Sequence, residues 1–164
     1  MKIERRIRTA RVMSNPTTGD ISGIAVPYNE ASSPLPGAGR DFREYMQPDA
    51  LEVSDDTVLI LQHDQTGVPL ARVGAGTLRF TEGESGLMFM ASLPSNRTDV
   101  HEALERGDLD GSVSVGMYVD EDEWTHGKEQ SIRKVTKGRL VELSLVVRGA
   151  YDGARGVYGG KPDG

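Results

Sequence analysis

The chain has 164 residues, the length of one ordinary domain. Its 25 acidic and 19 basic residues give a formal net charge of −6, which argues against a nucleic-acid binder because such proteins present basic surfaces to phosphates. The sequence has no cysteine, so disulfides, thiolate metal sites and cysteine nucleophiles are excluded. It also lacks the long apolar runs of a membrane helix or a signal peptide, so we expect a soluble protein that stays inside the cell.

Glycine and proline, with 20 and 8 residues, separate short segments rich in Val, Ile, Leu and Thr. Short β-prone segments separated by glycine and proline are typical of a mainly β domain. The pattern predicts strands, in chain order, at residues 3–13, 20–27, 42–46, 57–63, 70–81, 86–93, 111–119 and 139–147. Many short strands avoid exposed edges by closing on themselves, so we expect a closed or nearly closed antiparallel barrel.

One helix is predicted between the strands, over residues 98–106. Thr98 can cap its first turn, and Gly107 suits the left-handed residue that ends a helix. We further expect a helical turn at 47–53, a turn at 54–56, loops at 32–40 and 120–123, and a disordered tail beyond about Ala154.

Three histidines are the candidate general bases, because imidazole titrates near neutral pH. His126 lies in a polar segment and His101 on the expected exposed side of the helix, so both fit solvated surface residues. His63 ends the apolar run 58–62, where a buried strand emerges into a loop and a catalytic group gains rigidity and access. A hydrogen-bonded strand-end histidine without a catalytic role fits the same pattern.

A candidate nucleophile lies in the strand predicted at 111–119. Alternation places Ser112, Ser114 and Gly116 on one face and a row of valines on the other. We expect the valine face to point to the core and Ser114 to face outward, with room beside Gly116 for a substrate backbone. The alternative is an ordinary half-buried strand with serines on its solvent side.

Glu142 is the one carboxylate in the almost wholly apolar segment 139–147. Burying an unpaired charge is costly, so we expect a cation or a proton donor beside it. Arg139, Lys137 or Arg148 can serve as a structural partner, and an imidazole oriented by Glu142 is the catalytic alternative. The remaining glycine and acidic motifs lack the spacing of phosphate or calcium loops, and a metal hydrolase built on His63 and Asp64 has too few histidines.

Taken in order, segments between residues 21 and 154 resemble the caudovirus prohead serine protease family, tailed-phage relatives of herpesvirus assemblin. The resemblance is carried by GIAVPY at 23–28, FREYMQPDAL at 42–51, HD at 63–64, PLAR at 69–72, GTL at 76–78, GL at 86–87, SVGM at 114–117 and ELSLV at 142–146. Asp49 stands where the family usually has glycine, and Val115 and Met117 replace aromatic residues common beside the nucleophile.

The resemblance implies a catalytic triad of Ser114 as nucleophile, His63 as base and Glu142 as acidic third member, with Ser112 the less favoured serine. Backbone amides around Gly116, or the Arg148 side chain, are candidate oxyanion donors. It also implies an assemblin-like, mainly β (α+β) fold: an antiparallel barrel of about six to eight strands with a few short peripheral helices. Residues 1–150 would form a single prohead-protease domain and 151–164 a flexible Gly-rich tail.

The family role implies a serine endopeptidase that cleaves the scaffolding portion of the major capsid protein, and itself, inside the procapsid in the host cytoplasm. It further implies a homo-oligomer, without cofactor, metal, nucleic acid or membrane. The alternative is a non-catalytic capsid assembly or scaffold module that retains the protease fold. The enzyme requires Ser114 and His63 side chains within hydrogen-bond reach, or slightly beyond it without substrate, whereas the module does not.

Overall fold

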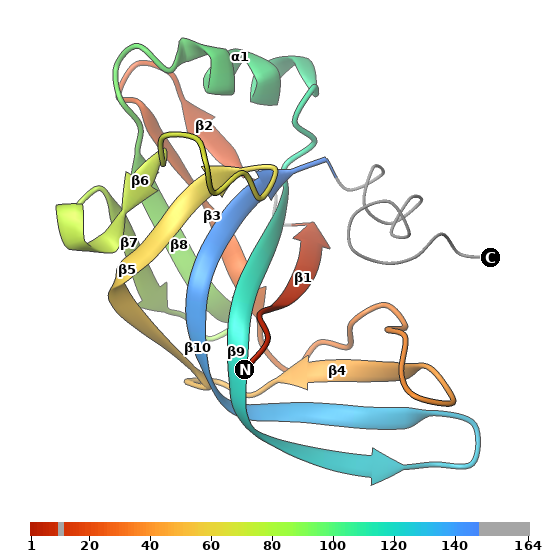
Figure 1. Cartoon of the computed structure of the whole chain (residues 1–164). Helices are drawn as coiled ribbons and strands as arrows, with labels where there is room; N and C mark the ends of the chain where they lie inside the picture. The colour runs from red at the N-terminus through yellow and green to blue at the C-terminus, as the bar shows by residue number, and fades with distance from the viewer. Residues whose placement is uncertain (10–11, 148–164) are drawn as a thin grey trace.

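The computed structural model describes residues 1–9 and 12–147, and within them the chain is mainly β, as predicted (Figure 1). The strands are β1 (Glu4–Thr9), β2 (Met13–Asn15), β3 (Asp20–Pro27), β4 (Phe42–Met46), β5 (Leu51–Leu61), β6 (Ala71–Arg72), β7 (Leu78–Glu82), β8 (Gly86–Ser92), β9 (Ser112–His126) and β10 (Ser131–Val146). One α-helix, α1 (Thr98–Arg106), and one 3₁₀ turn, η1 (Val73–Ala75), complete the described elements.

The larger sheet is organised around β10. One edge of β10 pairs with β9 in a long antiparallel hairpin, and the other edge pairs in parallel first with β4 and then with β5. The outer strands are β1, antiparallel to β9, and β6, antiparallel to β5. The tip of the β9–β10 hairpin, with β4 beside it, extends away from the rest of the fold (Figure 1).

The smaller sheet is antiparallel, with strand order β2-β3-β8-β7, and it packs against one face of the larger sheet. The valine face predicted for the nucleophile strand contributes Val113, Val115 and Met117 to the shared core, at 0–2% exposure, which confirms that prediction. Alternating residues of the smaller sheet, among them Ile21 and Phe89, supply the opposite side of the core.

In place of the single antiparallel barrel that we expected, the described residues form two sheets, and neither closes on itself. The apolar faces of the two sheets bury one another, so the core is completed without ring closure. The expectation of purely antiparallel pairing is wrong for the edge of β10, where β4 and β5 run parallel to it. The few short helices expected reduce to α1 and η1 in the described part of the chain.

The predicted helix forms, whereas the turns predicted near residues 47–56 do not form as expected. The helix at 98–106 is confirmed, and Gly107 adopts the left-handed conformation with φ of 84°, although the Thr98 side chain does not cap the helix. The predicted helical turn at 47–53 is wrong, because β5 already begins at Leu51. The expected turn at 54–56 is a bulge within β5, and 120–123 belongs to β9. The tail expected beyond Ala154 lies outside the described residues.

Membrane-spanning helices were searched for in residues 1–9 and 12–147. None of the helices there has the length and apolar character that a membrane span requires.

Candidate active site

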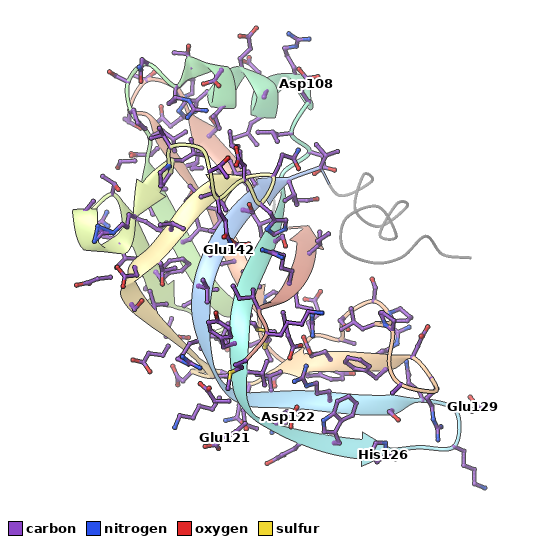
Figure 2. The ribbon with its side chains drawn as sticks, viewed as in Figure 1. Asp108, Glu121, Asp122, His126, Glu129 and Glu142 are labelled. Carbon is purple, nitrogen blue, oxygen red and sulfur yellow. The ribbon has the colours of Figure 1, made fainter. Side chains whose placement is uncertain are left out.

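The candidate site lies on the face of the larger sheet that is turned away from the shared core. On the paired strands β9 and β10, Ser114 lies opposite Ser144, and Gly116 lies opposite Glu142. Directly opposed residues of an antiparallel pair project to the same side, so these four residues share one face. Figure 2 places Glu142 in the body of the molecule, while His126 and Glu129 lie toward the hairpin tip.

A β-bulge gives Glu142 its direction. Leu140 lies opposite Met117 and Glu142 opposite Gly116, so two residues of β10 are matched by one step along β9, with Val141 as the extra residue. A bulge of this kind reverses the alternation of side chains beyond it. Leu140 therefore remains in the core, whereas Glu142 projects to the opposite face.

A strained turn brings His63 to the same face. The two residues that follow β5, Gln62 and His63, have φ values of 49° and 58°, a left-handed conformation that is unfavourable for residues with a side chain. The turn is fixed by hydrogen bonds from the Gln62 amide to the Leu145 carbonyl (2.9 Å) and from the His63 amide to the Ser144 hydroxyl (2.8 Å). The His63 backbone is thereby hydrogen bonded to Ser144, the residue directly opposite Ser114 on the neighbouring strand.

The Glu142 carboxylate is buried, at 1% exposure, and lies at the centre of a hydrogen-bond network. Its Oε1 lies 2.7 Å from His63 Nδ1 and 3.0 Å from Arg5 Nε, and its Oε2 lies 2.8 Å from Gln65 Nε2. Burial alone would raise the pKa of Glu142, but the hydrogen bonds from these three side chains outweigh burial and lower the pKa from 4.5 to about 2. The carboxylate is therefore ionised at neutral pH and can accept a hydrogen bond from the N–H group of the imidazole.

Ser114 is fully buried, so the expectation that it faces outward into solvent is wrong. Both faces of β9 are buried over 112–117. On the serine face, the Glu142 side chain lies against Gly116, and the His63 amide donates to the hydroxyl of Ser144, the cross-strand neighbour of Ser114. Within the described part of the chain, Ser114 Oγ is one of two buried side-chain nitrogen or oxygen atoms without a hydrogen-bond partner. The structure therefore places Ser114 and His63 on one face but forms no hydrogen bond between their side chains.

Gly116 accommodates the Glu142 side chain. A Cβ atom at residue 116 would lie 2.6 Å from Glu142 Cγ and 3.1 Å from its Oε1, distances that a side chain cannot occupy without displacing the carboxylate. The space that we expected to receive a substrate backbone is therefore filled by Glu142.

Two of the partners of Glu142, Arg5 and Gln65, were not anticipated from the sequence. The sequence predicts a strand at 3–13 but contains no signal for its register, which is what places Arg5 beside Gly116. The cations suggested as partners lie elsewhere: Arg139 bonds Asp120, and Lys137 lies 3.8 Å from Glu121. Arg148 is outside the described residues.

The other two histidines lie away from this face. His101 is buried, at 6% exposure, with Nδ1 hydrogen bonded to the Ser14 hydroxyl, so the expectation of an exposed His101 is wrong. His126 is exposed at the hairpin tip, where its ring stacks on Trp124 at 5.9 Å between centroids. Among residues 1–9 and 12–147, no group of three or more His, Asp or Glu side chains is arranged to hold a metal ion.

A serine, an imidazole and a buried carboxylate that bonds the imidazole are the groups used by serine hydrolases. The model of one such family, the caudovirus prohead serine proteases, matches residues 4–157. The chain therefore belongs to the caudovirus prohead serine protease family, the phage proteases of capsid maturation. Comparison with curated proteins and with solved structures gave no match.

Proposed function

We propose that this protein is a serine endopeptidase in which Ser114 is the nucleophile, His63 the general base and Glu142 the residue that orients the imidazole. The observation that carries the proposal is the 2.7 Å contact between His63 Nδ1 and Glu142 Oε1, on the same face as Ser114. This contact selects the tautomer in which Nδ1 carries the proton, so Nε2 is the nitrogen that accepts the serine proton.

The proposed reaction has two halves. Ser114 Oγ attacks the carbonyl carbon of the scissile peptide while His63 Nε2 takes its proton, and the tetrahedral intermediate collapses as His63 returns that proton to the leaving amine. Water, deprotonated by His63, then attacks the carbonyl carbon of the acyl-enzyme, and His63 returns that proton to Ser114 Oγ as the ester bond breaks, which releases the carboxylate product and the free serine. Such general base assistance contributes about 10² to 10⁴ in rate. Glu142 remains ionised throughout and stabilises the transient imidazolium.

Substrate binding must complete the arrangement, because Ser114 is buried and makes no hydrogen bond to His63. Catalytic hydrogen bonds are often long or misaligned before substrate binds, and they tighten in the complex. In this proposal, the incoming peptide displaces the residues that cover Ser114 and turns its hydroxyl toward the imidazole.

We infer from the family role that the substrates are the scaffolding portion of the major capsid protein and the protease itself, cut inside the procapsid. Confinement within a shell raises the effective concentration of enzyme and substrate, so weak substrate binding is sufficient there. A homo-oligomer is part of the same proposal.

The test is co-expression of the protein with its cognate capsid protein, comparing wild type, Ser114→Ala and Ser112→Ala. Ser112 is the matched control, because it is also buried and lies two residues away on the same strand. We expect wild type and Ser112→Ala to shorten the capsid protein and Ser114→Ala to leave it full length. Equal shortening by wild type and Ser114→Ala would overturn the nucleophile assignment.

A second candidate function, a non-catalytic assembly module with the protease fold, is favoured by one observation, the missing hydrogen bond between Ser114 and His63. A fluorophosphonate probe separates the two functions, since it reacts only with an activated serine. Labelling of wild type that is lost in Ser114→Ala supports the protease. No labelling, together with uncleaved capsid protein, supports the module.

A further inference from the structure

The N-terminal strand supplies a side chain to the candidate site. On β1, Arg5 lies opposite Gly116 and Ile7 opposite Ser114, so β1 runs alongside the proposed nucleophile strand. The Arg5 guanidinium reaches across Gly116 to Glu142, with Nε 3.0 Å from Oε1. This oxygen is the one that bonds His63 Nδ1.

The opposite face of β1 is anchored by a cluster of charged side chains around the buried Glu44. Arg6 binds both oxygens of Glu44 at 2.7 and 2.9 Å, and Arg133 of β10 binds Glu4 at 2.7 and 3.1 Å. Glu44 is completely buried. Because residues 4 and 6 alternate with residue 5 along the strand, fixing them also fixes the direction from which Arg5 approaches the site.

The arrangement around Glu142 restricts its carboxylate in three ways. Oε1 accepts from Arg5, Oε2 accepts from Gln65 at 2.8 Å, and Gly116 provides the surface on which the side chain lies. Arg5 is 44% exposed, and an ion pair with such a partner contributes little to stability by itself. Its effect is directional: with both oxygens held by N–H donors, the carboxylate cannot rotate away from the imidazole.

We propose that Arg5, presented by the N-terminal strand, is a positioning residue of the active site that acts together with Gln65 to hold Glu142 against His63. This inference rests on the proposed function, in which the Glu142–His63 pair activates Ser114. Arg5 itself touches neither the serine nor the substrate in this proposal, so its effect is transmitted through the carboxylate.

The experiment compares full-length wild type, Arg5→Gln, Arg5→Lys and, as a matched control, Arg139→Gln. Arg139 also forms a two-bond pair with a carboxylate, that of Asp120, but it lies on the exposed part of the sheet. Two quantities are measured: the second-order rate of labelling by a fluorophosphonate, and the ¹⁵N chemical shifts of the His63 ring nitrogens in ¹⁵N-histidine-labelled protein. The ring shifts report the tautomer and do not depend on catalysis.

We expect Arg5→Gln to slow labelling by up to about 100-fold and to move the His63 ring nitrogens toward values averaged between the two tautomers. Arg5→Lys should recover part of both, and Arg139→Gln should change neither. Unchanged labelling in Arg5→Gln, or slower labelling with unchanged His63 shifts, would overturn the proposal. If Arg5→Gln does not fold, Arg5→Lys and Gln65→Leu give the same comparison.

Failure of the proposed function gives a different result. In that case the fluorophosphonate does not label wild type at all, and the ring shifts alone decide: a tautomer change in Arg5→Gln supports the positioning role, and none overturns it.

Discussion

Glu142 is a buried acid that remains charged because three side-chain N–H groups donate hydrogen bonds to its two carboxylate oxygens. Its three N–H donors come from β1 and from the turn and loop after β5, so the charge is compensated by segments far apart in the sequence. A buried carboxylate without such donors would be neutral at pH 7 and could not stabilise an imidazolium.

The low pKa of Glu142 predicts a specific pH dependence of stability. Because the folded-state pKa of about 2 lies below the ordinary value of 4.5, the ionised group stabilises the fold above pH 4.5, and this contribution is lost as the pH falls toward 2. We expect Glu142→Gln to lower the free energy of unfolding by about 3 kcal/mol at pH 6, with the gap to wild type closing near pH 2. Urea unfolding at pH 6, 4 and 2.5 measures this gap.

The matched control for that series is Glu129→Gln, the same chemical change at the exposed hairpin tip (Figure 2). It should leave the free energy of unfolding within about 0.5 kcal/mol of wild type. A gap between wild type and Glu142→Gln that stays constant from pH 6 to 2.5 would contradict the assigned pKa.

At the level of elements, two local irregularities assemble the candidate site from otherwise regular strands. The bulge at Val141 turns Glu142 out of the core, and the left-handed turn at Gln62–His63 brings the imidazole back over the sheet. Such features cost free energy, and they persist only where surrounding hydrogen bonds fix them. Here those hydrogen bonds come from Ser144 and Leu145 on β10, the strand that carries Glu142.

A third left-handed residue allows a prediction away from the site. Asp49 has φ of 61° in the turn between β4 and β5, at the position where related proteins were expected to have glycine. Asp49→Gly should raise the free energy of unfolding by about 0.5 kcal/mol, because glycine adopts this conformation without steric cost, while Asp49→Val should lower it by about 1 to 2 kcal/mol. Thermal unfolding of the three proteins measures the order. A more stable Asp49→Val would show that the turn is not strained.

At the level of the whole molecule, the charge cluster around the buried Glu44 joins the extended hairpin tip to the body of the fold. It combines Arg6 and Glu4 of β1, Glu44 of β4, Arg133 of β10 and Asp122 of β9. Burial opposes the charge on both arginines, but the surrounding carboxylates outweigh it and raise the pKa of each guanidinium above its ordinary value. Both arginines therefore remain charged, and each of them binds more than one carboxylate of the cluster.

Removing the central carboxylate should destabilise the protein severely. Glu44→Gln removes the completely buried carboxylate that binds both Arg6 and Arg133 and leaves Glu4 as the carboxylate that both still contact, so we expect the free energy of unfolding to fall by about 3 kcal/mol. Lys137→Gln is the control, since it breaks only the exposed contact with Glu121 and should change the free energy by less than about 1 kcal/mol. Urea unfolding at pH 7 distinguishes them, and similar values for both variants would contradict a structural role for the cluster.

The sequence was sufficient to predict those features that depend on local pattern. Strands β3 and β4 were predicted at their observed limits, the valine face of β9 was assigned to the core, and Glu142 was expected to have a partner. The parallel pairings of β10, the burial of Ser114 and the contribution of Arg5 were not predicted. Each of these depends on which strand edges meet, and alternation within one strand contains no information about its neighbours. The assignment of Ser114, His63 and Glu142 as a triad stays a prediction.

Because residue 116 is a glycine, the Glu142 side chain occupies the space that a side chain at position 116 would need. Sequence change at one of them is therefore conditional on the other: an alanine at 116 becomes tolerable only after the acid at 142 is shortened or replaced. Relatives that keep a glutamate on this strand should carry glycine opposite it, and relatives that have lost the acid should be free to vary there. Covariation between positions 116 and 142 in natural sequences would show that the two side chains compete for the same space.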